Sequence, residues 1–169
     1  LSDALSCDIH WARDLFGTLE AAGQNPTPRP LAALNTARAE AGFAIRATGK
    51  PSRPIVMRYL RENDRADVML RHIVKVESGA ELTLLESNSA AARFNMAIEV
   101  DVADDAAFHH VRAQSRDHER LAATHVFARL GARAQQDVER GVAAIVEDHV
   151  GAVGELERAV EVIPVLRQG

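Results

Sequence analysis

A repeat of about 26 residues is the feature that most constrains the fold of this chain. The segment 74–84 resembles the segment 100–110, and matched residues such as Val74 and Val100 are 26 positions apart. A weaker third copy places Val126 after Val100 at the same offset. A fixed period of roughly 20 to 50 residues is typical of solenoids, in which each unit buries its apolar face by stacking on a neighbour.

Each repeat follows a strand, corner, strand pattern. Apolar side chains alternate with polar ones before the corner, and alternation resumes after it, which predicts two strands per repeat. The small or turn-forming runs 78–80 and 104–106 suit sharp corners. We therefore predict a mainly β fold, a parallel β-solenoid, with a small antiparallel sandwich as the competing interpretation. The expected stacks are Val74 on Val100 on Val126, and Ala80 on Ala106 on Ala132.

Composition limits the class of protein further. The 169 residues suffice for one domain, and the formal net charge of −4 argues against a general nucleic-acid or membrane binder. The start of the chain does not read as a leader peptide, and no apolar run approaches membrane length. The single Cys7 cannot form an internal disulfide, which fits a reducing cytoplasm.

Three regions follow from these patterns. Residues 1–42 are expected to form an amino-terminal helical region, including a short helix from Leu31 to about Ala41. Residues 43–134 are expected to form the β coils. From Gln135 to residue 169, apolar residues recur every three or four positions, which predicts a carboxy-terminal helical tail. The apolar residues of this tail include Val138, Val142, Val146, Val150, Val153, Leu156 and Val160.

Several segments resemble the SufB/SufD family of iron-sulfur cluster assembly proteins, and the amino-terminal part of its SufD branch in particular. They are the runs 30–37, 43–46 with Pro54-Ile55, 72–86, 108–114 and 124–131. The resemblance covers roughly Trp11 to Ala134. It implies a right-handed parallel β-helix between helical terminal regions, in agreement with the repeat. Family members continue with many more coils, whereas here we expect the coils to stop near Ala134.

The resemblance also implies a function. It points to a non-catalytic scaffold subunit of a cytoplasmic complex, in which SufD pairs with SufB and each engages the ATPase SufC. The complex would assemble an iron-sulfur cluster transiently, and this chain alone would bind no cofactor. The chain is then not expected to be an enzyme, and self-association is expected when it is expressed alone.

Two other functions fit the fold. One is a structural or oligomerising β-solenoid. The other is a carbohydrate-active β-helix enzyme, which needs acidic residues and aromatic platforms on one outer face. Aromatic residues make up only 4% of the chain, which counts against the enzyme.

Histidines and acids after the second corner form the only cluster that resembles a metal site. Adjacent strand residues point to opposite faces, so His109 and His110 cannot both face one ion, and His110 shares the inward face of Phe108. Exposed or core histidines are therefore favoured over a metal site, and Cys7 alone cannot hold a cluster that needs about four ligands. The cluster comprises His109, His110, His118, His125, Asp104, Asp105, Asp117 and Glu119.

The remaining candidates for chemistry have ordinary interpretations. Ser78 and Ser115 lack the setting of a nucleophilic serine, and no phosphate-binding loop is present. Asp104 and Asp105 suit a turn better than paired catalytic carboxylates. Four arginines in and after the second repeat are most simply interpreted as exposed to solvent on one face. The alternative is that they form a partner-binding patch. They are Arg112, Arg116, Arg120 and Arg129.

Overall fold

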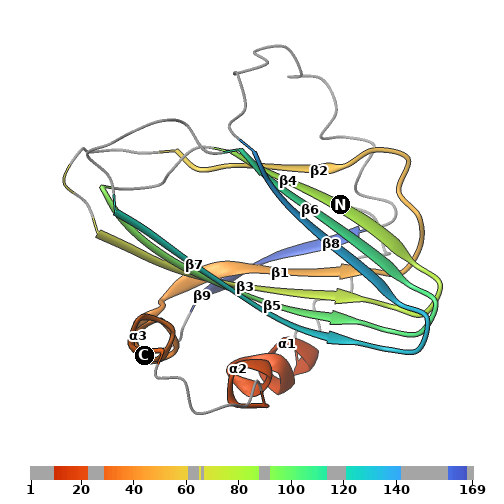
Figure 1. Cartoon of the computed structure of the whole chain (residues 1–169), viewed down its shortest axis with the longest axis horizontal. Helices are drawn as coiled ribbons and strands as arrows, with labels where there is room; N and C mark the ends of the chain where they lie inside the picture. The colour runs from red at the N-terminus through yellow and green to blue at the C-terminus, as the bar shows by residue number, and fades with distance from the viewer. Residues whose placement is uncertain are drawn as a thin grey trace.

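The computed structural model describes seven stretches of the chain, and it consists mainly of two facing β-sheets (Figure 1). The described residues are 10–22, 29–60, 65, 67–87, 92–113, 121–141 and 160–166. None of the helices in these stretches is long and apolar enough to cross a membrane.

Sheet A has the strand order β7-β5-β3-β1-β9, and sheet B has the order β2-β4-β6-β8. The chain alternates between the sheets, and strands of the same sheet that follow one another pair in parallel. The exception is β9, which pairs antiparallel with β1. The mainly β prediction is therefore confirmed, and the antiparallel-sandwich alternative is wrong. The strands are β1 (Ala41–Ala47), β2 (Ile55–Arg58), β3 (Asp67–Val76), β4 (Glu81–Ser87), β5 (Arg93–Val102), β6 (Ala107–Ala113), β7 (Leu121–Leu130), β8 (Gln135–Gly141) and β9 (Val160–Leu166).

The register confirms the repeat for its first two copies and corrects it for the third. Val74 pairs with Val100 as predicted, but Val126 pairs with Ile98, and Val100 pairs with Ala128. The offset has grown to 28 residues, because seven residues (114–120) separate β6 from β7 where five (88–92) separate β4 from β5. A strict period cannot anticipate such an insertion between two repeats.

The same shift appears at the corners that join sheet A to sheet B. Gln135 pairs with Ala107, so Ala134, and not the predicted Ala132, takes the position after Ala106. The backbone is left-handed at the equivalent corner position of three successive repeats, with φ of 70° at Gly79, 57° at Asp105 and 55° at Arg133. Glycine and aspartate adopt this conformation more readily than arginine does.

The prediction of a helical tail from Gln135 is wrong where the structure describes the tail. Residues 135–141 form β8 and extend sheet B, and residues 160–166 form β9 along the edge of β1. Val138 of β8 pairs with His110 of β6. The four-residue spacing from Val138 to Val142 had suggested a helix. The parallel strands of sheet B therefore continue beyond Ala134, where we expected the β region to end. Val142, Val146, Val150, Val153 and Leu156 lie outside the described residues.

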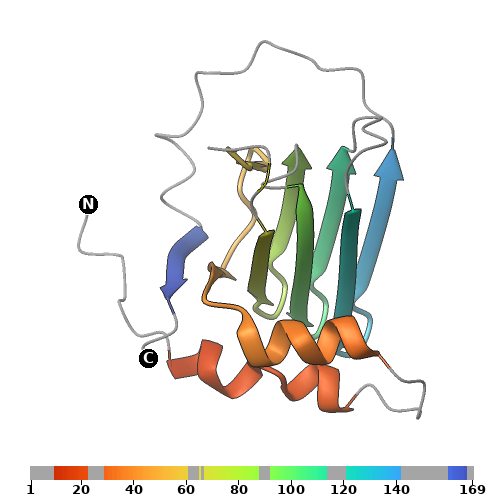
Figure 2. The same cartoon turned by 90° about the vertical axis from the view of Figure 1, so that its left-hand side faces the viewer.

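Three helices cover the side of sheet A that faces away from sheet B (Figure 2). They are α1 (His10–Leu15), α2 (Thr18–Ala22) and α3 (Pro30–Arg38). The last of these confirms the short helix predicted near Leu31. Leu15 of α1 packs with Ile73 of sheet A, and Leu19 of α2 packs with Phe127. Between α1 and α2, Gly17 adopts a φ of 73° and turns the chain.

The main core fills the space between the two sheets. Sheet A contributes residues such as Val74 and Val100, and sheet B contributes residues such as Leu82 and Phe108, all of which are fully buried. The core is apolar near the corners, which we call the corner end. It becomes polar at the opposite end, the loop end, where strands of sheet B finish and strands of sheet A begin.

Candidate functional site

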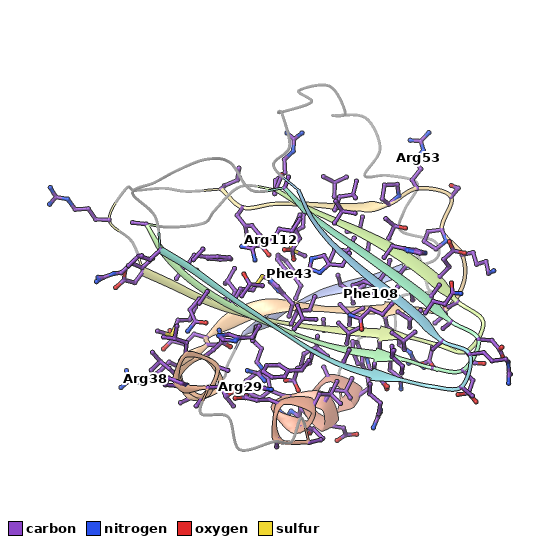
Figure 3. All side chains as sticks on the ribbon, viewed as in Figure 1. Arg29, Arg38, Phe43, Arg53, Phe108 and Arg112 are labelled. Atoms are coloured by element: carbon purple, nitrogen blue, oxygen red, sulfur yellow. The ribbon has the colours of Figure 1, made fainter. Side chains whose placement is uncertain are left out.

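Polar side chains collect between the sheets at the loop end, where an apolar core would be expected. The alternation that buries Leu82 and Leu84 carries Glu86 inward as well, and the alternation of Phe108 and His110 does the same for Arg112. Figure 3 shows Arg112 and Phe108 lying between the sheets. Each residue of this inter-sheet cluster is at most 7% exposed: Tyr59, His72, Glu86, His110 and Arg112.

Strand register brings the cluster together across three strands. Glu86 of β4 lies beside Arg112 of β6, and His110 lies two residues before Arg112 on the same face. His72 of β3 approaches from sheet A, and Tyr59 follows directly on from β2. The Tyr59 backbone N–H donates to the Ser87 carbonyl at 3.2 Å, which holds the phenol at the end of sheet B.

The hydrogen bonds of His72 define its tautomer. The backbone N–H of Phe43 donates to Nδ1 of His72 at 3.1 Å, so Nδ1 must be the unprotonated nitrogen. Nε2 then carries the hydrogen and donates it to the Tyr59 hydroxyl at 2.9 Å. Complete burial lowers the pKa of His72 to about 4, so the ring is neutral at neutral pH.

Tyr59 passes this chain of hydrogen bonds on to sheet B. Its hydroxyl donates to Oε1 of Glu86 at 3.3 Å and also lies 3.4 Å from the sulfur of Met96. Burial and, after it, the negative charge of Glu86 raise the pKa of the phenol. The Tyr59 hydroxyl therefore keeps its proton. His72 donates a hydrogen bond to Tyr59, and Tyr59 donates one to Glu86.

Glu86 stays ionised although it is buried. Burial alone raises the pKa of its carboxyl group, but the neighbouring His110 and Arg112 outweigh that effect and bring the pKa below its ordinary value. Oε2 of Glu86 lies 3.4 Å from Nε2 of His110 and 3.9 Å from Nε of Arg112. The guanidinium of Arg112 also donates to the Thr124 hydroxyl of β7 and lies 5.3 Å from the Phe94 ring centroid.

The cluster is not the arrangement that stability alone would favour. Within the described part of the chain, Nδ1 of His110 has no hydrogen-bond partner, and Nε2 of His110 and Oε2 of Glu86, which face each other at 3.4 Å, form no well-aligned hydrogen bond. Buried polar atoms left in this way cost roughly 1–3 kcal/mol each, and apolar side chains of similar size would avoid the cost. Such sites are good candidates for function, because proteins tend to break packing rules where function requires it.

Several predicted site residues lie on other faces of the molecule. His110 is buried and His109 is half-buried on the opposite face of β6, as alternation predicted. His125 lies on β7, where its ring stacks on that of Phe127. The structure therefore does not bring these histidines together. No group of three or more His, Cys, Asp or Glu residues among the described stretches is placed to hold a metal ion.

The paired aspartates have the turn roles that were predicted. The Asp104 carbonyl accepts hydrogen bonds from the Gly79 N–H and the Ser78 hydroxyl, which ties one corner to the next. Asp105 forms a two-bond pair with Arg133 at 2.6 Å.

Two of the four arginines predicted to form a solvated face lie in the described part of the chain, and they differ in burial. Arg129 is exposed and paired with Asp101. Arg112 is buried, so its prediction as part of a solvated face is wrong. The alternation from Phe108 carries Arg112 inward. Cys7, Ser115, Arg116, Asp117, His118, Glu119 and Arg120 lie outside the described residues.

A second buried network joins the helices to the outer face of sheet A. Arg71 donates to Glu99 through Nε at 2.8 Å and through Nη2 at 2.6 Å, and both side chains are almost fully buried. Glu99 in turn accepts the backbone N–H groups of Gly17 and Leu19 at 2.6 and 2.9 Å. Arg71 also donates to Glu20 of α2 and to Asn35 and Thr36 of α3. These bonds hold the helices on sheet A, so we assign this network a structural role.

Tyr59 and Glu86 were not predicted from the sequence as members of a site. The alternation of side chains along β4 could have revealed Glu86, because it places Glu86 on the same inward face as Leu82 and Leu84. Charged residues at inward strand positions are uncommon and therefore indicate a possible site. The link between Glu86 and His72 through the Tyr59 hydroxyl could not be found in this way, because the two residues lie on different sheets.

Comparison with protein families places the chain in a class. The family model described as "SUF system FeS cluster assembly, SufBD core domain" matches residues 59–143, half of the chain. The matched region begins at Tyr59, runs from β3 through β8, and contains the whole inter-sheet cluster. This protein belongs to the SufBD family of the SUF system of iron-sulfur cluster assembly. Searches of curated proteins and of solved structures found no significant match.

Proposed function

We propose that this chain is a non-catalytic scaffold subunit of the SufD type, which acts in the cytoplasm by association with SufB and the ATPase SufC. The observation that carries the proposal is the family match over residues 59–143, which coincides with the stacked sheets. The family's role in SUF cluster assembly supports association with other SUF components. The single cysteine supports a scaffold role, because a cluster typically needs about four ligands and partners would have to supply most of them.

The two sheets support a more specific architecture. Each coil contributes one strand to sheet A and one to sheet B, and successive strands of each sheet are parallel. We propose that these coils form a right-handed parallel β-helix. Within the described strands, β7 and β8 are the edges of their sheets on the same side of the stack. Their unpaired backbone groups favour pairing with a further strand, which fits a subunit that works by association.

A pull-down tests the partners. The chain, tagged and co-expressed with SufB and SufC, is expected to retrieve both proteins. A matched variant, Ala128→Pro, places proline within the edge strand β7, where it removes one backbone N–H. The variant is expected to retrieve less SufB if β7 is part of the contact. Retrieval of neither partner by the parent chain would contradict the scaffold proposal.

The second candidate is a structural or oligomerising β-solenoid. The same open edges favour it, since they can pair with another copy of the chain. Size-exclusion chromatography with light scattering distinguishes the two. Self-association that persists in the presence of SufB and SufC, without retrieval of either, would favour the oligomerising solenoid.

A further inference from the structure

The strand β9 differs from the other strands of the two sheets. Among the described strands it alone pairs antiparallel, and it lies on the outer edge of β1. The strand before it, β8, lies at the opposite edge of the other sheet, as Figure 2 shows with β9 in dark blue and β8 in light blue. Because β9 belongs to none of the parallel pairs, its removal leaves each of those pairs intact. We call β9 the edge cap.

The backbone of β1 shows how the edge cap is attached. The Phe43 N–H donates to the ring of His72 on β3 at 3.1 Å. The Ala47 carbonyl accepts the N–H of Glu77, which follows β3, at 2.9 Å. Because the backbone groups of alternate residues point to opposite sides of a strand, the even-numbered residues of β1 direct theirs toward the edge cap. The pairs across this edge are Gly42–Val165, Ala44–Ile163 and Arg46–Glu161.

The proline of β9 occupies a position that suits the end of a sheet. Pro164 is opposite Phe43, so its nitrogen points away from β1, and the pairing with β1 loses no hydrogen bond there. The same nitrogen carries no hydrogen, so the outer edge of β9 lacks a donor within the strand. Prolines placed in this way discourage the addition of another strand. The edge cap therefore pairs with β1 but accepts a further strand poorly.

The edge cap also makes the two sheets unequal on this side. With β9, sheet A has five strands, whereas sheet B has four. Without β9, β1 and β2 would be the edges on one side, and β7 and β8 are the edges on the other. A second copy could then add its β7 to β1 and its β8 to β2, and both sheets would continue in parallel. With β9 present, the two contacts are out of step by one strand spacing, about 4.8 Å.

The side formed by β7 and β8 has no such protection within the described strands. The strand β7 has ten residues and β8 has seven, and neither contains proline. By contrast, β2 has four residues and directly follows Pro54. Short edge strands and prolines are common protections of sheet edges. The two sheets thus have one protected side and one open side.

We propose that the edge cap is an autoinhibitory strand, which covers the β1 edge and prevents head-to-tail assembly of this chain. The occupant of the uncovered edge is a second copy. Its β7 and β8 edges continue the same two sheets in the same strand direction as the β1 and β2 edges. A head-to-tail contact that continues both sheets does not close on itself and produces fibres. With the cap in place, copies associate at most in pairs, through their β7 and β8 edges.

Ile163→Pro in the full chain opens the cap. Ile163 is paired with Ala44, so the substitution removes an N–H that points toward β1. Light scattering after size-exclusion chromatography is expected to show assemblies larger than a dimer, whose mass grows with concentration. Val162→Pro is the matched control, because the nitrogen of Val162, like that of Pro164, points to the outer edge, and this variant is expected to keep the mass of the parent. The parent's mass in Ile163→Pro, or equal growth in both variants, would overturn the proposal.

A second substitution distinguishes ordered assembly from aggregation of a misfolded chain. The Leu121 N–H donates to the carbonyl of Ala92, which precedes β5, so even-numbered residues of β7 such as Ala128 face the open edge. Adding Ala128→Pro to Ile163→Pro removes a donor from that edge, and the assemblies are expected to return to a dimer or smaller. Assemblies that persist in the double variant would show aggregation and contradict head-to-tail pairing.

A disulfide closes the cap reversibly in a single chain. Arg46 and Glu161 are register partners, and such residues lie about 5.5 Å apart between Cα atoms, within the reach of a disulfide. In an Ile163→Pro chain that also carries Arg46→Cys, Glu161→Cys and Cys7→Ser, oxidation is expected to suppress the assemblies, and dithiothreitol is expected to restore them. Non-reducing electrophoresis checks that the link lies within one chain.

Assemblies that do not respond to this oxidation would show that β9 does not control the β1 edge, and would overturn the proposal. None of these measurements includes SufB or SufC, so the proposed function is tested separately.

Discussion

Among single residues, His72 has the clearest consequence for stability. Its folded pKa of about 4 lies below the ordinary value of 6.5, so the unfolded chain binds a proton at His72 at a higher pH than the folded chain does. The stabilisation is therefore complete above about pH 6.5 and is lost as the pH falls from 6.5 to 4. Each pKa unit corresponds to about 1.4 kcal/mol, so the loss is about 3 kcal/mol at most. Glu86, whose pKa is also lowered, adds a loss below about pH 4.5 in the same direction.

Urea unfolding at a series of pH values measures this effect. The free energy of unfolding of the parent chain is expected to fall between pH 7 and pH 5. In His72→Gln, which cannot titrate, the slope over this interval is expected to be smaller. His109→Gln is the matched control, because His109 lies on the outer face of sheet B. A slope that His72→Gln leaves unchanged would show that His72 does not carry the acid sensitivity.

Residue-level prediction from sequence worked where alternation alone decides a position. The inward direction of His110 and the turn role of Asp105 follow from period two and from the conformational tolerance of aspartate. Arg112 was wrongly predicted to be exposed, because its charged side chain was given more weight than its inward position in the alternation of β6. The hydrogen bond from His72 to Tyr59 could not be predicted, because it depends on the approach of one sheet to the other and not on any spacing along the chain.

At the scale of elements, the pair Arg71–Glu99 is expected to hold the helical layer on sheet A. Glu99→Gln leaves the guanidinium of Arg71 buried beside a neutral amide, and breaking a buried pair in this way usually costs about 3–5 kcal/mol. Asp67→Asn is the control, since it removes a carboxylate that also pairs with an arginine on a neighbouring strand but is 51% exposed. Its cost is expected to be below about 1 kcal/mol.

Hydrogen exchange measured by mass spectrometry shows which segments lose stability in Glu99→Gln. In Glu99→Gln, faster exchange is expected in 10–22, because the N–H groups of Gly17 and Leu19 lose a charged acceptor. The strands of sheet B are expected to change little. A double variant, Arg71→Met with Glu99→Leu, removes both charges and is expected to recover part of the stability. Uniform loss of protection throughout the chain would contradict a local clamp.

The elements themselves were only partly predictable. The strands of the first two repeats and α3 were found because their periods are clean. The third repeat shifted because two additional residues in 114–120 change the register without changing the hydrophobic pattern. The strand β8 was mistaken for a helix because a seven-residue segment with one valine has no periodicity of its own. Its assignment depends on pairing with β6.

For the whole molecule, membership of the SufBD family and the supply of ligands together determine what the isolated chain can hold. The sequence has one cysteine, and iron-sulfur clusters are usually bound by about four ligands, most of them thiolates. The chain, purified alone and reconstituted anaerobically with iron and sulfide, is therefore expected to retain less than one cluster per chain after desalting. Absorbance near 400 nm with iron and sulfide analysis measures this.

The same reconstitution in the presence of SufB and SufC is expected to yield a stable cluster, because the partners add the ligands that this chain lacks. Cys7→Ser serves as the control: if the cysteine is not a required ligand, the complex containing this variant retains its cluster. A stoichiometric cluster on the isolated parent chain that disappears in Cys7→Ser would mean that copies of this chain provide the ligands to one another. The chain would then be a cluster-binding protein in its own right, and the scaffold proposal would be wrong.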